Sequence, residues 1–466
     1  MASNTGYISK FFLIIFIVSL SISSQANSQI WKQKGQTANK YINCIYLFGD
    51  DHQSIAVASD QLNTDLAKDE IAEVPYDGNG FQISTDGGAT FGETFLDGYR
   101  VFSILQSPTD PAKWYVATRK NIRNYMAVTK DNMGEWNFSC DNSSQVMDMT
   151  FSDLNKNRIL CASTMSSEGF MTTEDDFETC KDYGVNFSSR SIQVSSFDQN
   201  LLFMAGDDKR GGVWRSTDGG DTWQHSETGL KHLRVLCVMP GGYDISEIYA
   251  GCDSLTDEKS KGMGIYQSLD TGKTWKRVGA EGYRIFDIKK HPKNPQLMAA
   301  AGDSSGVWFS GSWGYSWENF SDGLPTDKPV RHIEIPNWST ASGLKVIAAV
   351  YGVGLFESDP VVTSVEDTPD YKSTSSGIEI LRTYPMPFNS SMRISWNNER
   401  EQYVEVYVID QMGRKVTTID NRRFGSGEQL TIFNTEGLSL STGVYMLCIK
   451  SNGKIQSRKI FFDPNK

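Results

Sequence analysis

The chain carries an eight-residue turn pattern three times, and this repeat limits its possible folds more than any other feature. The copies begin at Ser84, Ser216 and Ser268, and the second reads Ser-Thr-Asp-Gly-Gly-Asp-Thr-Trp. In such a pattern the Asp accepts hydrogen bonds from backbone N–H groups, and the glycines adopt positive φ at no steric cost. The closing aromatic ring suits packing between neighbouring sheets. The pattern therefore predicts a repeat protein built from β-sheets.

Weaker copies of this turn, which we call the box, fill the gaps between the strong ones. The intervals are roughly 42–52 residues, a period that is typical of propeller blades. We assign a structural, turn-forming role to the box carboxylates, which are Asp86, Asp131, Asp175, Asp218 and Asp270. Each interval has four short apolar strands, and the third strands are centred on Phe81, Met126, Phe170, Val213, Ile265, Val307 and Leu355. The sequence therefore predicts an all-β fold, a seven-bladed β-propeller.

The seventh blade lacks a fourth strand of its own, because Gly354–Ser358 runs directly into Asp359-Pro360. The segment Ile30–Lys34 has the Trp that opens fourth strands elsewhere. We therefore expect this first strand of the mature chain to complete the last blade and remove the free edge of the ring.

The chain divides into four parts. Residues 1–26 have a short apolar run followed by Ser-Gln-Ala, which indicates a secretory signal peptide. The propeller is expected over 27–360, and 361–379 are rich in Ser, Thr, Asp and Pro, as in a flexible linker. Residues 380–466 again alternate as strands and predict a small C-terminal β-sandwich.

Composition excludes several classes of function. The net charge of −11 disfavours nucleic acid as a partner, and no later stretch is apolar enough for a membrane span. Histidine and cysteine spacing indicates no metal site, and no cofactor is expected. Of the seven cysteines, Cys237 and Cys252 are placed on neighbouring strands and are a candidate pair, although the sequence does not decide the pairing. The others singled out as small buried residues are Cys44, Cys161 and Cys448.

The box resembles the Asp-box, or BNR, repeat of sialidases, xyloglucanases and sortilin-type receptors, over about residues 30–360. That resemblance implies a propeller in which the box lies opposite the usual ligand-binding face. It does not select among the functions of these families.

The C-terminal part resembles the type A sorting domain of the type IX secretion system. The matching segments are Tyr384–Phe388, Val406–Arg414, and Gly443–Leu447 followed by Lys459 and Ile460. The resemblance implies passage through the inner membrane by the signal peptide and then across the outer membrane by the secretion machinery. The protein is therefore expected to be secreted or held at the outer cell surface.

Arginines recur where innermost strands begin, at the mouth of the predicted propeller. Four share one phase, and we interpret them as ligand-binding residues for anionic groups: Arg100, Arg234, Arg284 and Arg331. Arg190 is one residue out of phase. The alternative is that each arginine braces adjacent blades by pairing with a nearby acid such as Asp97, Glu281 or Asp327.

The ends of the second strands supply carboxylates at matching positions, Asp60, Asp207 and Asp303. Two carboxylates across a funnel can serve as acid and base on a glycosidic bond when about 5–10 Å apart. The alternative is that they cap turns. An acidic insertion from Gln61 to Asn79 follows the first of them, as a lid over the mouth or a solvated excursion.

From these features we expect a type IX-exported propeller that binds or processes an extracellular, anionic polysaccharide. Its partners are then the glycan and the type IX machinery. Two alternatives remain, a glycoside hydrolase using carboxylates at the mouth and a protein-interaction module of the cell envelope. A polysaccharide lyase, with Tyr46 or His332 as base, is a lesser option, so whether the protein is an enzyme stays open at this point.

Overall fold

The computed structural model describes residues 31–464 apart from short gaps and longer ones at 61–77, 256–261, 337–342 and 363–376. Every regular element in this described part is a β-strand. The predicted signal peptide and the acidic insertion up to residue 77 lie outside the described residues, as does most of the predicted linker.

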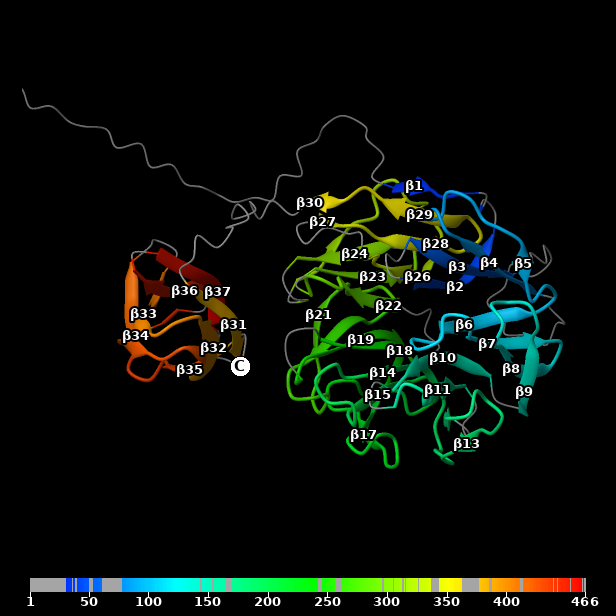
Figure 1. The fold of residues 1–466 in the computed structure, drawn as a ribbon, viewed down its shortest axis with the longest axis horizontal. Coiled ribbons are helices and arrows are strands. Elements are labelled where there is room, and N and C mark those ends of the chain that lie inside the picture. The colour runs from blue at the N-terminus through cyan, green and yellow to red at the C-terminus, as the bar shows by residue number, and fades with distance from the viewer. Residues whose placement is uncertain are drawn as a thin grey trace, which may run out of the picture.

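Seven four-stranded antiparallel sheets form the blades of the propeller, arranged in a ring (Figure 1). Their innermost strands are β2 (Tyr41–Phe48), β6 (Arg100–Gln106), β10 (Val146–Phe151), β14 (Ser189–Val194), β18 (Leu233–Pro240), β22 (Ile285–Lys290) and β26 (Val330–Glu334). The second strands are β3 (Ser54–Asp60), β7 (Trp114–Lys120), β11 (Ile159–Ser163), β15 (Leu202–Gly206), β19 (Ile248–Ser254), β23 (Met298–Gly302) and β28 (Ile347–Val350). The sevenfold prediction is confirmed.

Two further sets of strands complete the blades. The third strands are β4 (Gly78–Ser84), β8 (Arg123–Thr129), β12 (Phe170–Thr173), β16 (Val213–Ser216), β20 (Gly264–Ser268), β24 (Val307–Ser310) and β29 (Gly354–Ser358). The outermost strands are β5 (Thr94–Phe95), β9 (Asn137–Asn142), β13 (Lys181–Asp182), β17 (Gln224–Ser226), β21 (Lys276–Gly279), β25 (Glu318–Asn319) and β1 (Trp31–Gln33). A small ribbon of β27 (Gly343–Leu344) and β30 (Val361–Val362) adjoins the last blade in sequence.

The first described strand closes the ring, as predicted. β1 pairs antiparallel with β29, with Trp31 opposite Ser358 and Gln33 opposite Phe356. Figure 1 shows this blue strand beside the yellow one. The Trp31 side chain is fully buried, and its indole N–H donates to the carbonyl of Phe320 at 2.9 Å. Both ends of the propeller chain therefore meet in one blade, where β1 covers the edge that β29 would otherwise expose.

The box turns explain why the repeat is recognisable. Asp218 accepts the N–H of Thr222 at 2.9 Å, and the buried Ser216 hydroxyl accepts the N–H of Gly220. The Gly219 and Gly220 positions have φ of 73° and 98°. The same two positions keep positive φ in boxes that have no glycine there, where they are occupied by Asn132 and Met133, or by Asp176 and Phe177. The turn therefore keeps its positive φ angles even where glycine, the residue that adopts them most easily, is replaced.

The cysteine prediction is wrong. Cys237 and Cys252 are free and buried, because a bulge between Val235 and Cys237 places Cys237 opposite Gly251. The two side chains consequently join different core clusters, on opposite faces of the sheet. Cys44, Cys161 and Cys448 are free and buried, as predicted.

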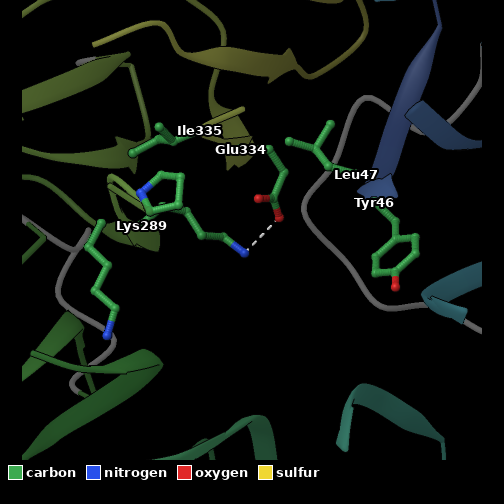
Figure 2. A pocket seen from close by; sticks show the side chains of 7 residues that line it. Tyr46, Leu47, Lys289, Glu334 and Ile335 are labelled. Atoms are coloured by element: carbon green, nitrogen blue, oxygen red, sulfur yellow. Dashed lines mark hydrogen bonds and ion pairs between the residues drawn. The ribbon is translucent and has the colours of Figure 1, made fainter. Parts of the chain in front are cut away.

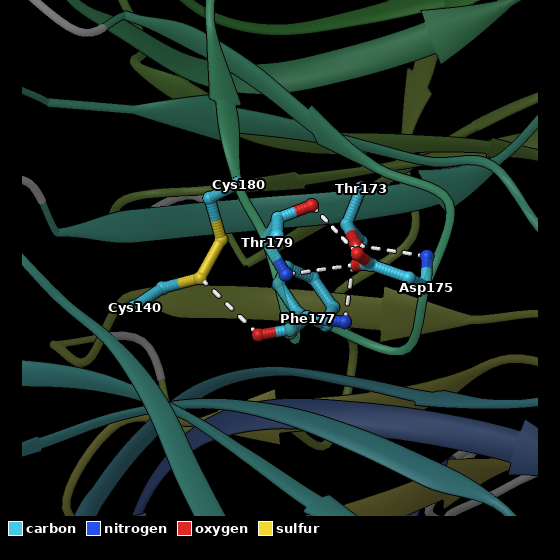
Figure 3. Close-up of a disulfide and its surroundings, with 6 residues drawn as sticks. All are labelled: Cys140, Thr173, Asp175, Phe177, Thr179 and Cys180. Carbon is cyan, nitrogen blue, oxygen red and sulfur yellow. Dashed lines mark hydrogen bonds between the residues drawn. A yellow bond between two sulfur atoms is a disulfide. The ribbon is translucent and has the colours of Figure 1, made fainter.

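The disulfide joins Cys140 to Cys180, two outer positions of neighbouring blades (Figure 3). Cys180 stands where other boxes have an aromatic ring. In the next blade that ring is Trp223, which packs at 5.1 Å from Phe170 of the preceding blade. The disulfide thus makes covalently the contact that aromatic packing makes elsewhere.

The C-terminal domain is a two-sheet β-sandwich. One sheet has the order β31 (Ile378–Tyr384), β32 (Ser391–Asn398), β35 (Gly427–Asn434), and the other has β34 (Lys415–Phe424), β33 (Gln402–Ile409), β36 (Gly443–Ser451), β37 (Lys454–Phe462). The sequence pattern missed β31 and β34. Much of β34 is exposed, so it lacks the clear apolar alternation from which a strand is predicted.

Candidate functional site

The predicted arginines and carboxylates meet at one face of the propeller, which we call the mouth. There the innermost strands begin and the second strands end. Arg100 opens β6, Arg234 and Arg331 are second in β18 and β26, and Arg284 directly precedes β22. Asp60 ends β3, and Asp207 and Asp303 directly follow β15 and β23.

The two predicted sets of residues contact one another. Arg100 Nε lies 2.9 Å from an Asp60 oxygen, and Arg234 Nε lies 3.3 Å from Asp207. In both pairs the arginine belongs to the blade that follows the carboxylate. Arg190, the arginine out of phase, contacts Asp207 of its own blade at 2.5 Å. The ion pairs therefore join neighbouring blades at the mouth.

One member of this set was missed in the sequence. Asp253, near the end of β19, lies 3.3 Å from Arg284 Nε. Its string Gly-Cys-Asp is equivalent to the Ala-Gly-Asp of the neighbouring blades, so alignment of second-strand ends would have found it. The acids proposed as bracing partners by sequence proximity lie elsewhere: Glu281 contacts Arg277, and Asp327 contacts Lys328.

The paired groups differ in depth. The carboxylate side chains of Asp60, Asp207 and Asp253 are 9–12 % exposed, whereas the arginines that contact them are 34–40 % exposed. The positive groups are therefore the outer layer of the mouth. A carboxylate at Nε occupies one edge of a guanidinium, and the plane carries further N–H donors on its other edges.

Aromatic rings hold two of these arginines in place. The Arg331 guanidinium lies 4.4 Å from the ring centroid of Phe286 and 5.2 Å from that of Tyr351. Arg100 lies over Phe102 at 5.3 Å. Cation–π contacts of this kind orient the flat guanidinium and place aromatic surface next to it.

Burial changes the chemistry of one mouth carboxylate. Desolvation raises the pKa of Asp60, and the opposing effects of Arg100 and of a hydrogen bond from Asn43 do not cancel it. A carboxyl group with a raised pKa holds its proton more readily, as a general acid must.

A second polar cluster, absent from the sequence predictions apart from His332, crosses the centre of the ring. Lys289 Nζ contacts Glu334 at 2.8 Å and Asp287 at 3.9 Å. The two ring nitrogens of His332 lie 3.3 Å from Asp287 and 3.2 Å from Glu334. These four residues, which we call the channel network, join β22 to β26 along the propeller axis.

Contacts within the channel network determine the protonation states of Lys289 and Glu334. Burial raises the pKa of Glu334, but Lys289 and His332 overcome this effect and lower it to about 2. For Lys289 burial acts in the other direction and lowers the pKa. The negative charges of Asp287 and Glu334 outweigh this effect of burial and raise the pKa above its usual value. Lys289 and Glu334 are therefore both ionised at neutral pH.

Acidic side chains at the centre of the ring accept hydrogen bonds from backbone N–H groups of the bulged innermost strands. The bulge leaves a backbone N–H facing the preceding blade, and Asp148 accepts that of Ile192 at 3.0 Å. Asp287 accepts that of Ile333 at 3.2 Å. Central acids thus satisfy buried backbone donors and link consecutive blades.

A cavity of about 240 Å³ opens at the end of the innermost strands, opposite the mouth (Figure 2). Its walls are Tyr46, Leu47, Lys289, Lys290, Pro292, Glu334 and Ile335. The Tyr46 hydroxyl accepts the N–H of Gln106 at 3.1 Å, and Lys290 donates to the carbonyl of Pro240 at 3.0 Å. These two groups, one of which was considered as a lyase base, are thus held by the fold.

The residues that the structure describes contain neither a metal-binding cluster nor a membrane-spanning helix. No group of three or more His, Cys, Asp or Glu side chains among them is arranged to hold a metal ion. No helix in the same part of the chain is long and apolar enough to cross a membrane.

Comparison with known proteins gives one family match. Residues 382–463 match the family model described as the secretion system C-terminal sorting domain. The protein is therefore exported by type IX secretion, to the cell surface or beyond it. No curated protein sequence matches the chain.

Solved structures support the propeller. YCF48 from Cyanidioschyzon merolae superposes with a TM-score of 0.50 at 13 % identity, covering 71 % of this chain and 98 % of its own. A GH74 xyloglucanase from Xanthomonas campestris gives a TM-score of 0.53 at 9 % identity and covers 92 % of this chain and 74 % of its own. An ancestral GH74 enzyme gives 0.54 at 12 % identity, and this chain matches 64 % of its length. At these identities the likeness concerns the fold alone.

Proposed function

We propose that this type IX-exported propeller binds an extracellular, anionic polysaccharide at its mouth. The observation that carries the proposal is the layering of charge, with guanidinium groups outermost and their carboxylate partners buried beneath. Guanidinium planes bind carboxylate and sulfate groups through paired N–H donors. The aromatic rings beside Arg100 and Arg331 offer flat apolar surface to sugar rings.

Several further features support binding as the main activity. The ion pairs at the mouth are ordered by burial and by contacts between blades, so the arginines are held before a ligand arrives, which lowers the entropic cost of binding. Two of the carboxylates that could act in catalysis, Asp60 and Asp207, lie beneath the arginines that contact them, so a ligand at the mouth meets guanidinium groups first.

The test is a binding experiment on the full mature chain with three immobilised glycans: polygalacturonate, chondroitin sulfate and neutral xyloglucan. We expect binding to an acidic glycan that weakens as salt rises, because exposed charges are screened over about 8–10 Å at physiological ionic strength. Each arginine lost from the mouth should reduce binding by about 1.5–3 kcal/mol. Arg331→Ala and Arg234→Ala are the test variants.

Arg277→Ala is the matched control, because Arg277 lies on the outer strand β21, is 36 % exposed and contacts Glu281. If the mouth variants lower the melting temperature but leave glycan binding unchanged, the arginines are braces and the proposal fails. YCF48 is described in one structure as bound to a D1 peptide, so peptides belong among the competitors.

Glycoside hydrolysis is the second candidate, favoured by the raised pKa of Asp60. In this mechanism Asp60 is the general acid, and Asp207 or Asp303 supplies the second carboxylate. Product release from the bound glycan would be abolished in Asp60→Asn while binding persists. Binding without product in the unmodified protein would rule this candidate out.

A further inference from the structure

Among the described residues of the sorting motifs, most apolar side chains are buried. Tyr445 is 9 % exposed, Leu447 is fully buried and Ile460 is 1 % exposed, and all three belong to the domain core. These side chains fold the domain and are not available for contact from outside. The surface that the secretion machinery contacts must therefore be sought among the exposed residues.

One exposed apolar pair stands out on β35. Leu430 is 61 % exposed and Ile432 is 58 % exposed, while the alternate residues Thr431 and Phe433 are 5 % and 1 % exposed. The strand thus has one face in the core and an apolar outer face. A soluble surface ordinarily carries polar side chains at such positions.

The position of β35 makes this pair unusual. β35 is the last strand of its sheet, hydrogen-bonded to β32 on one side only. An edge strand with apolar side chains is a template for pairing with another chain, and proteins usually protect such edges with charges or proline. Here the polar groups lie around the pair: Arg393 is opposite Ile432, and Ser395 donates to Glu428 at 2.5 Å.

We propose that the outer face and free edge of β35, with Leu430 and Ile432 at its centre, is the surface that docks on the type IX secretion machinery. The occupant is an extended apolar segment of that machinery, which adds as a strand to β35. The match to the sorting family supplies the partner, because a sorting domain is read by the machinery that exports it. An apolar centre with a polar rim is the usual anatomy of a protein interface.

Among the described residues of the domain, the other exposed apolar side chains form no comparable surface. Tyr403 and Ile455 are 57 % and 52 % exposed but lie on β33 and β37, which β36 separates. The Tyr403 hydroxyl also donates to the carbonyl of Asn421 at 3.1 Å. This pair therefore serves as a matched control of equal exposure on the opposite sheet.

The experiment compares export of the full chain carrying Leu430→Ser and Ile432→Ser with the chain carrying Tyr403→Ser and Ile455→Ser. Cell-surface and periplasmic fractions are measured in the native host. We expect the β35 variant to lose at least about tenfold of its surface delivery and to accumulate in the periplasm. The control variant should be delivered like the unmodified protein.

Folding is followed through the melting temperature of the purified variants, which should be unchanged because the replaced side chains face solvent. Leu430→Lys is a second variant that places a charge on the edge without removing volume. Normal export of both β35 variants would overturn the proposal, as would equal loss in the control. A change in oligomeric state with normal export would instead identify this face as a contact between copies of the chain, and would equally overturn it.

Discussion

At the scale of the residue, acidic side chains in this protein have environments that shift their pKa in opposite directions. The box carboxylates are exposed or half-buried and accept hydrogen bonds, and the Thr222 hydroxyl and N–H lower the pKa of Asp218 to about 2. Burial raises the pKa of Asp60 at the mouth. Glu334 at the centre is also largely removed from solvent, with its side chain 20 % exposed, yet its ion pair with Lys289 lowers its pKa. Hydrogen bonds, desolvation and charge pairing each dominate at one place.

The first prediction concerns Glu334→Gln. Because the pKa of Glu334 in the folded chain lies below the usual 4.5, its ionised form stabilises the fold above about pH 4.5. This contribution is lost as the pH falls towards 2. At pH 7 the variant should lose about 1–3 kcal/mol of unfolding free energy, since Lys289 loses its nearest partner in a partly exposed site.

Chemical denaturation at pH 7 and at pH 3 measures this effect, and the difference between the variant and the unmodified protein should shrink at the lower pH. Glu281→Gln is the control, because its ion pair with Arg277 is exposed and should contribute less than about 1 kcal/mol. Equal effects of the two substitutions would show that the channel network does not stabilise the ring.

At the scale of the element, the outer strands are joined by different chemistry at the same position. Trp275 reaches the preceding blade through a hydrogen bond from its indole N–H to Ser226 at 3.1 Å. Trp136 packs on Phe81 of the preceding blade at 6.1 Å. Between the second and third blades the disulfide between Cys140 and Cys180 replaces this packing. A cysteine at a box position therefore still links blades.

The second prediction is that replacing both Cys140 and Cys180 by Ser lowers the unfolding free energy by about 2–4 kcal/mol. The cause is that the bond closes a loop of 40 residues in the unfolded chain and that no aromatic ring takes over its contact. Thiol reductant should destabilise the unmodified protein by a similar amount and leave the variant unaffected. A reductant effect that persists in the variant would contradict this account, because the remaining cysteines described are free thiols.

At the scale of the whole molecule, the protein consists of a closed propeller ring and a β-sandwich to which we assign different roles. The ring is closed by β1 and has its own core clusters, and the sandwich has a core of its own around Trp396 and Phe433. Their sequences are joined through a segment that the structure does not describe. Ligand binding is proposed for the ring, and export rests on the sandwich.

The third prediction follows from this division. Deleting 380–466 should leave a folded propeller, since the closing contacts of Trp31 and Ser358 are kept. The truncated protein should accumulate in the periplasm, because it lacks the sorting domain. Circular dichroism and glycan binding of the truncated protein test the first part, and cell fractionation tests the second. Normal amounts of truncated protein at the cell surface would refute it.

The sequence by itself determined the repeat, the number of blades, the strand that closes the ring and the sorting domain. The sorting domain came from its resemblance to a known family, whereas the other three follow from local chemistry, because a box turn such as Ser216–Thr222 forms its hydrogen bonds within a few residues. Alternating apolar strands between such turns then leave few arrangements. The arginines and carboxylates of the mouth were also visible as residues in phase.

The tertiary structure alone decided how those groups are paired. Arg100 meets Asp60, and Arg284 meets Asp253, because the ring places the start of one blade against the second strand of the blade before it. It also decided the disulfide and the channel network, whose members lie in separate blades. These contacts across blades join residues from 27 positions apart, as in Arg234 and Asp207, to 45 positions apart, as in Lys289 and Glu334, and neither turn chemistry nor strand alternation carries information over such distances.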